Sequence, residues 1–240
     1  MIILDIESTV SVTRDDPRYA ALATEAARRQ SRKGGPQSCE EFQALCPLLA
    51  RPVAIAMWST ATERGQVAYD VTLLGAGLPV PEGWAGVPWG GERPLLEWAH
   101  QTLDAFGRVM VSCGFNSLRY DLPLLWHRAR IHGVTTALHL ADAFAQKPWD
   151  ARHHIDLAAA SLRDNYSLRT YALAYGLDDP KAEGTGADIE RLILEEPGAV
   201  LRYVCGDVRA TAQLAERLGF ALPAVPDPRP TQFALLPRDA

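Results

Sequence analysis

The first ten residues combine the pattern of a buried strand with two carboxylates. They read MIILDIESTV, and Asp5 and Glu7 interrupt an otherwise apolar run. On a strand, residues two apart point to the same face, so Asp5 and Glu7 are expected side by side while Leu4 and Ile6 face the other way. Two like charges in a partly buried place raise each other's pKa unless a cation neutralises them, which favours a divalent metal. An edge strand with an acidic solvent face is the simpler alternative.

Length and composition favour one large α/β domain. The chain has 240 residues, of which 48% are hydrophobic, enough to bury a substantial core. Its four cysteines form no Cys-x-x-Cys pair and no zinc-type spacing with histidine, so neither a disulfide framework nor a structural zinc is expected. No segment approaches the roughly 18 apolar residues needed to cross a bilayer. These features favour a soluble, cytoplasmic protein without a membrane partner.

The charge distribution bears on nucleic acid as a partner. A net charge of -5 argues against nonspecific adhesion, but it permits a nucleic-acid enzyme whose positive charge is local. Residues 14–33 contain six basic and three acidic side chains and lie in an insertion of about 13–50 between the first two expected strands. This segment is interpreted either as an arm that grips a nucleic-acid strand or as a solvated helix face followed by a loop.

Hydrophobic periodicity predicts strands early in the chain and helices late. Strand patterns cover residues 1–6, 51–60, 65–74 and 108–114. Residues 80–94 are rich in glycine and proline and are expected to form turns. Helical spacings cover residues 16–33, 39–49, 95–106, 120–133, 154–162, 167–177, 186–196 and 198–220. The tail, 220–240, contains five prolines and is expected to be an extended appendage.

Two further acidic positions follow the first pair. In GFNSLRYDLPLL, Asp121 lies where a buried strand passes into the next helix, and a plain helix cap would explain it equally well. In YVCGDVRAT, Tyr203 and Asp207 are four residues apart on an expected helix and therefore share one face. Taken singly, neither pattern indicates a function.

The ordered set of three motifs is more specific. Asp-x-Glu on the first strand, Asn-x-x-x-Tyr-Asp at a strand-to-helix junction and Tyr-x-x-x-Asp on a late helix resemble the DEDDy group of the DnaQ-like 3'-5' exonuclease superfamily, and most closely its PolB-like predicted exonucleases. HHIDL, SLRTYALAYGL, DDPKAEGTG and YVCGDVRATAQL carry the same resemblance. It covers roughly residues 1–219, the expected exonuclease domain, with gaps through the insertion. Ser8 and Tyr120 stand where relatives often have Thr and Phe.

The resemblance implies a fold, a metal site and a reaction. The fold would be an RNase H-like mixed β-sheet flanked by helices, with a helical C-terminal half. Two Mg²⁺ or Mn²⁺ ions would support hydrolysis of phosphodiester bonds from the 3' end of single-stranded DNA, and Tyr203 would position the attacking water. The implied metal ligands are Asp5, Glu7, Asp121 and Asp207. The expected substrate-binding residues are Ser8, Thr9, Asn116, Tyr120 and His154.

The sequence leaves alternative functions and several partners open. An exoribonuclease would share the whole catalytic set, and a noncatalytic nucleic-acid-binding module would keep the fold. His153, His154 and Asp156 could form another metal site, but His154 and Asp156 are favoured as strand-end residues near the cleft. Gln232–Leu236, within TQFALL, resembles a peptide that binds bacterial sliding clamps, and an apolar tail packed on the domain is the alternative. Because no polymerase segment is present, a proofreading role would require a polymerase in trans.

Overall fold

The computed structural model describes residues 1–30, 38–107, 110–147, 150–160, 166–181 and 184–220. The strands in chain order are β1 (Ile2–Val10), β2 (Ala50–Ser59), β3 (Arg64–Asp70), β4 (Trp84–Trp89), β5 (Ser112–Gly114) and β6 (His154–Asp156). The helices are α1 (Tyr19–Gln30), α2 (Cys39–Ala44), α3 (Val71–Leu74), α4 (Glu92–Gly107), α5 (Asp121–Ile131), α6 (Leu138–Ala145), α7 (Leu157–Ala160), α8 (Leu168–Ala174), the short 3-10 helix η1 (Gly186–Asp188), α9 (Ile189–Glu195) and α10 (Pro197–Arg217).

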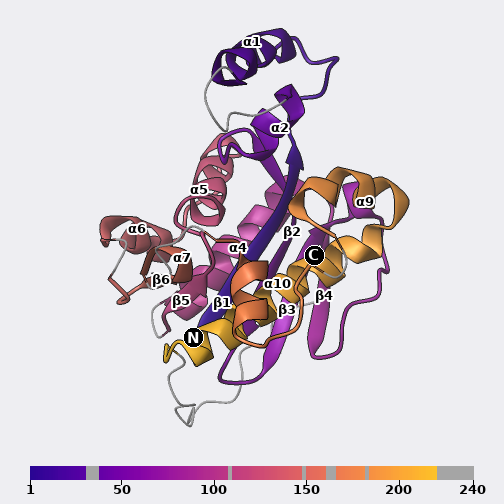
Figure 1. Cartoon of the computed structure of the whole chain (residues 1–240). Coiled ribbons are helices and arrows are strands. Elements are labelled where there is room, and N and C mark those ends of the chain that lie inside the picture. The colour runs from indigo at the N-terminus through magenta and orange to yellow at the C-terminus, as the bar shows by residue number, and fades with distance from the viewer. Residues whose placement is uncertain (31–37, 108–109, 148–149, 161–165, 182–183, 221–240) are drawn as a thin grey trace.

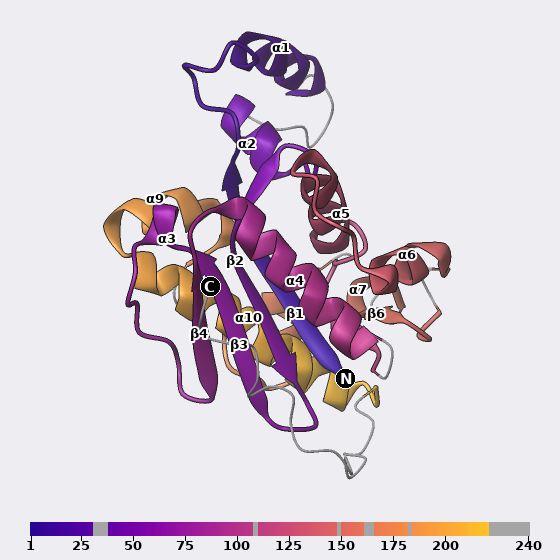
Figure 2. The same cartoon turned by 180° about the vertical axis from the view of Figure 1, so that it is seen from behind.

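The strands form one mixed six-stranded sheet in the order β4-β3-β2-β1-β5-β6. β1 pairs antiparallel with β2 and parallel with β5, so it lies in the interior of the sheet. β2 and β3 are antiparallel, whereas β3–β4 and β5–β6 are parallel. Figures 1 and 2 show α10 on one face of the sheet and α4 on the other. The expected fold class, an α/β mixed sheet flanked by helices, is confirmed.

Each face of the sheet carries its own hydrophobic core. Ile3 of β1 packs with Val204, Val208 and other apolar residues of α10. Leu4, also of β1, packs on the opposite side with a second cluster that includes Leu96 of α4. This separation follows from the alternation of side chains along a strand. The same alternation places Asp5 and Glu7 on the α10 side, within a face that is otherwise apolar.

Helix α10 is the longest described helix, and one side of it is buried along its length. Pro197 occupies its first turn, where a missing N–H removes no helical hydrogen bond. Its buried residues include Val200, Tyr203, Val204 and Asp207, at spacings of three and four. This is the pattern of an amphipathic helix packed on a sheet, and it turns Tyr203 and Asp207 toward β1.

Three local expectations are wrong. Residues Trp84–Trp89 form β4, although the glycines and prolines around them indicated turns, and Pro88 is tolerated because β4 is an edge strand. Residues 71–74 form α3 instead of continuing β3, because the Asp70 side chain accepts a hydrogen bond from the Thr72 backbone N–H at 2.9 Å and begins a helix. Residues His154–Asp156 form β6, a strand too short for periodicity to distinguish from the following helix.

The insertion forms a small unit at one end of the sheet. Helices α1 and α2 lie beyond the end of β1 in both views (Figures 1 and 2) and pack on each other through Ala26, Cys39 and Phe42. Its described arginines are paired with nearby carboxylates. These pairs are Arg14 with Glu40, Arg18 with Asp16, and Arg28 and Arg29 with Glu25. The described part of the expected basic arm is therefore locally neutralised.

Several other expectations concern composition and the tail. All four cysteines are free thiols. Among the described residues, no helix is both long enough and apolar enough to span a membrane. Residues 221–240, including the clamp-like Gln232–Leu236, lie outside the described residues.

Candidate active site

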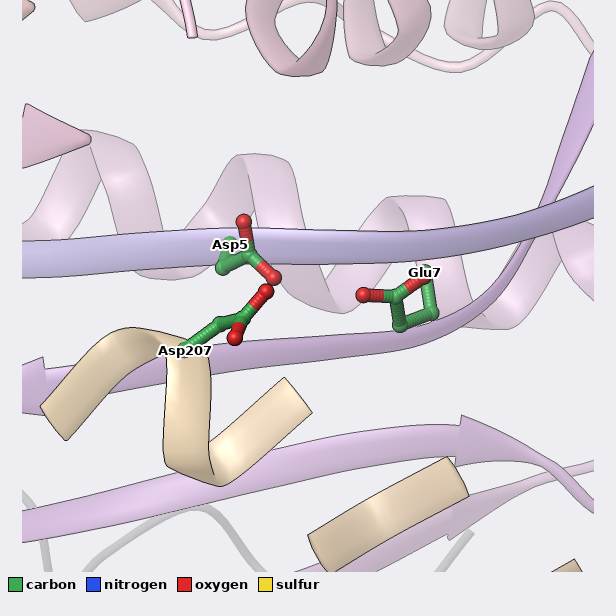
Figure 3. A group of neighbouring side chains, drawn as sticks. All are labelled: Asp5, Glu7 and Asp207. Carbon is green, nitrogen blue, oxygen red and sulfur yellow. The ribbon is translucent and has the colours of Figure 1, made fainter. Parts of the chain in front are cut away.

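Three carboxylates from two elements meet between the sheet and α10. β1 carries Asp5 and Glu7 on the face that α10 covers, and α10 contributes Asp207. One potential ligand atom from each of the three lies within 4.8 Å of the other two. Figure 3 shows the carboxylates gathered between β1 and the helix. Residues about 200 positions apart in the sequence are thus brought to one point by the packing of α10 on β1.

The donor set fits a hard divalent cation. Asp5 Oδ2 and Asp207 Oδ1 are buried oxygens without a hydrogen-bond partner among the described residues. Buried polar atoms are usually paired, so two unpaired carboxylate oxygens within one cluster are compatible with a cation as their partner. Carboxylate oxygens without thiolate or imidazole neighbours suit Mg²⁺ or Mn²⁺ better than zinc. The cluster could therefore hold a metal ion.

The electrostatics of the cluster also favour a bound cation. Burial, followed by the charge of Asp207, raises the pKa of Asp5 to about 7. Burial and then the charge of Asp5 raise the pKa of Glu7 well above its usual range. Burial also raises the pKa of Asp207, while the ammonium of Lys181 opposes the rise at all three groups. The carboxylates ionise together readily only when further positive charge is present.

Asp121 lies beside this cluster but outside its tightest group. It is the first residue of α5 and is 4% exposed. Burial and then the charge of Asp5 raise the pKa of Asp121, and Asp121 in turn raises the pKa of Glu7. The N-cap of α5 is Tyr120, which makes no side-chain capping bond. Helix capping therefore does not explain Asp121, whose carboxyl group is electrostatically linked to the acids of β1.

Tyr203 and Lys181 complete the surroundings of Asp207. Tyr203, one turn before Asp207 on α10, is 2% exposed. The Lys181 ammonium donates hydrogen bonds to Asp207 Oδ2 and to the Tyr203 hydroxyl, and its Nζ lies 4.1 Å from the centre of the Tyr203 ring. Lys181 was not among the site residues predicted from the sequence. Its loop, DDPKAEGTG, carried part of the family resemblance, but no spacing indicated where this side chain would point.

Asp156 and His154 support the loop that leads to Asp121. Asp156, at the end of β6, accepts hydrogen bonds from the backbone N–H groups of Asn116 and Leu118, both at 2.9 Å. His154 is fully buried, and both ring nitrogens are bonded to serine hydroxyls at 2.7 Å. The contact of His154 with substrate that the sequence predicted would require these two hydrogen bonds to break. The two residues hold the 115–120 loop against the sheet.

The close approach of this loop also depends on Gly114. A Cβ added at Gly114, the last residue of β5, would lie 2.5 Å from Ser117 Oγ. Glycine is therefore needed for the chain to turn back tightly toward Asp121. In the same loop Asn116 is exposed and has a φ of 58°, a conformation that asparagine tolerates better than most residues.

The remaining predicted substrate residues lie around the far end of β1. Ser8 Oγ and the Tyr120 hydroxyl are 2.6 Å apart, and the Tyr120 hydroxyl also donates to the backbone carbonyl of Ala44 in α2. Thr9 donates to Glu190 of α9 at 3.4 Å. Tyr120 thus joins β1, α2 and the start of α5.

Comparisons with known proteins identify a structural neighbour. No protein family and no curated protein matches the sequence. Among solved structures, 142 chains match. One of them is the family B DNA polymerase from the hyperthermophilic archaeon Pyrobaculum calidifontis, with a TM-score of 0.55 and 19% identity over 90% of this chain. The chain spans 24% of that polymerase's length. At this identity the likeness shows the fold, which is consistent with an RNase H-like domain.

Proposed function

We propose that the chain is a metal-dependent 3'-5' exonuclease of the DEDDy type, with its catalytic domain over residues 1–219, acting on the 3' end of single-stranded DNA. The observation that carries the proposal is the convergence of Asp5, Glu7 and Asp207, with unpaired buried oxygens, on one side of the sheet. Asp121 and Tyr203 lie next to them, as the family resemblance implies. The fold shared with a family B DNA polymerase supports the same class of enzyme.

The carboxylates would hold Mg²⁺ or Mn²⁺, and the ions would stabilise charge on the attacking and departing oxygens of an in-line displacement at phosphorus. Asp5, Glu7 and Asp207 form the core of this ligand set, and Asp121 adds its charge from the adjoining helix. Lying in the interior of the sheet, β1 keeps the first two acids at a constant separation. This rigidity favours catalysis, because positioning contributes much of the rate in phosphoryl transfer.

Tyr203 would orient the attacking water rather than remove its proton. Burial, followed by the charges of Glu7 and Asp207, raises the pKa of the Tyr203 hydroxyl above its ordinary value, so the phenol stays protonated at neutral pH. Its oxygen accepts a hydrogen bond from Lys181, which leaves its own hydrogen available for donation. A neutral phenol in this position can direct a water lone pair, but it is a poor base.

DNA is favoured as the substrate, and the experiment described below also tests whether RNA is cleaved instead. The polymerase with a similar fold acts on DNA by its name, whereas contacts to the 2'-hydroxyl group would decide between the nucleic acids here. Asn116 is exposed in the loop that leads to Asp121, and it would be available to the terminal nucleotide. Two protein partners of the chain are also proposed. One is a polymerase acting in trans, and the other is a sliding clamp bound through Gln232–Leu236.

The test uses single-stranded DNA, duplex DNA and RNA, each labelled at the 5' end, with Mg²⁺, Mn²⁺ or EDTA. The wild-type protein should give a ladder that shortens from the 3' end only when metal is present. Asp5→Ala and Asp207→Ala should abolish it, while Asp142→Asn, which changes an exposed acid on α6, should not. Cleavage of RNA alone would make the enzyme an exoribonuclease. Binding without cleavage under every condition would refute the nuclease assignment.

A further inference from the structure

The acidic cluster already contains one positive charge. Among the described residues, Lys181 is the only lysine or arginine paired with Asp5, Glu7, Asp121 or Asp207. Its ammonium contacts Asp207 Oδ2 and the Tyr203 hydroxyl, and its side chain is 17% exposed. One ammonium opposite four carboxylates compensates only part of their charge.

The loop that carries Lys181 is anchored outside the cluster. The Asp179 side chain accepts a hydrogen bond from the Lys181 backbone N–H at 2.9 Å and forms an ion pair with Arg169 of α8 at 2.8 Å. The backbone of this turn is therefore tied to α8, while the flexible side chain of Lys181 extends to α10. A lysine has four rotatable methylenes, so its ammonium can leave a carboxylate without movement of the turn.

A divalent ion would interact with the same carboxylates. Lys181 occupies Asp207 Oδ2, whereas Asp207 Oδ1 and Asp5 Oδ2 have no partner. An ion bound by these oxygens would lie close to the ammonium and be repelled by it, and in a poorly solvated place that repulsion is only weakly screened. Lys181 also lowers the pKa of Asp5 and Glu7, against the effect of burial, which reflects the same partial neutralisation.

We propose that Lys181 is a tethered counter-ion of the acidic cluster: its ammonium stabilises the metal-free carboxylates and competes with divalent ions, so that it lowers the metal affinity of the site. This inference rests on the metal centre of the proposed function, but it concerns binding rather than hydrolysis. Lys181 thereby allows the chain to keep its acids buried before metal arrives, and it keeps the ions exchangeable.

The experiment measures Mn²⁺ binding without nucleic acid. Isothermal titration calorimetry and the electron paramagnetic resonance signal of free Mn²⁺ give the dissociation constant of the wild type and of the Lys181→Met variant. Methionine is similar in length, uncharged and a poor ligand for hard cations. The Lys181→Arg variant retains the charge, and Arg93→Gln removes an exposed charge from α4, on the opposite face of the sheet. Thermal unfolding in EDTA checks that each variant is folded.

Lys181→Met should bind Mn²⁺ about tenfold more tightly than wild type or more, while Lys181→Arg and Arg93→Gln should stay within about threefold. Equal or weaker binding by folded Lys181→Met would overturn the proposal. If that variant does not fold, Lys181→Gln is judged by the same criterion. Tighter binding in a protein that cleaves no nucleic acid would leave this inference standing and refute the proposed function. Normal cleavage by the wild type, with the same Mn²⁺ affinity in wild type and Lys181→Met, would refute this inference and support the proposed function. Absence of Mn²⁺ binding in every variant would refute both the inference and the proposed function.

Discussion

Replacing Asp5 by asparagine removes one negative charge from the cluster of Asp5, Glu7 and Asp207 while keeping the shape of the side chain. We expect Asp5→Asn to stabilise the metal-free protein at pH 8, although it should abolish metal-dependent activity. The reason is that the wild-type chain folds against the repulsion of buried carboxylates, which burial and the charge of Asp207 make hard to ionise. Active-site acids of this kind often cost stability that function requires.

The size of the effect follows from the pKa of Asp5. This pKa is about 7 in the folded protein, compared with about 3.9 in an unfolded chain. At about 1.4 kcal/mol per unit, ionising Asp5 costs at most about 4 kcal/mol above pH 7. Relaxation of the neighbouring acids and of Lys181 reduces this, so we expect about 2 kcal/mol. For a chain of this size that corresponds to a rise in Tm of about 4–8 °C.

The pH dependence gives the sign of the effect. Below about pH 4, Asp5 is protonated in both states, so the variant and the wild type should be equally stable. Between about pH 4 and pH 7 the unfolded state loses its proton before the folded state does, and the wild type loses stability relative to Asp5→Asn. Above about pH 7 the difference should be constant.

The assay is thermal and urea unfolding in EDTA from pH 4 to pH 8.5, repeated with Mg²⁺. Asp142→Asn, at an exposed position of α6, controls for the loss of one negative charge. With Mg²⁺ the order should reverse, because only the wild type binds the ion well enough to gain stability from it. Lower stability of Asp5→Asn in EDTA at pH 8, or a gain that is the same at pH 4 and pH 8, would contradict the reasoning.

Three further predictions concern the surroundings of the site. Tyr203→Phe should lower kcat about 10- to 100-fold without changing the shape of the pH–rate profile, because the phenol stays protonated throughout; a lost basic limb in single-turnover kinetics would contradict this. Asp156→Ala removes the acceptor of the Leu118 backbone N–H and should cost about 2–3 kcal/mol in urea unfolding, together with weaker Mn²⁺ binding. Glu92→Gln leaves the buried Arg128 guanidinium without its bidentate partner and should cost about 3–5 kcal/mol, whereas kcat of the remaining folded protein should not change.

Much of the fold could be predicted because its periodicities are strong. The apolar run of β1 and the long amphipathic pattern of α10 are both present in the structure. β4 was missed because Gly86 and Pro88 lie within the strand itself, and only its pairing with β3 makes it one. β6 was missed because three residues carry too little periodicity.

The candidate site, too, was predicted from the sequence only in part. That Asp5 and Glu7 share a face follows from the period of a strand, and that Tyr203 and Asp207 share one follows from the period of a helix. The sequence could not show that Asp121 lies outside the tightest group of acids. Nor could it show that His154 is enclosed by serine hydroxyls.

By itself, the sequence determined which chemical groups this chain can present and on which face of its own element each lies, because those depend on residue type and local backbone geometry. Only the tertiary structure decided which faces meet. The packing of α10 on β1 brings Asp207 to Asp5, and the turn before η1 sends Lys181 to the same point. Such long-range contacts depend on the burial of whole faces, so local periodicity does not show them. Only the resemblance of the three motifs to a known family had implied that Asp5 and Asp207 share one site.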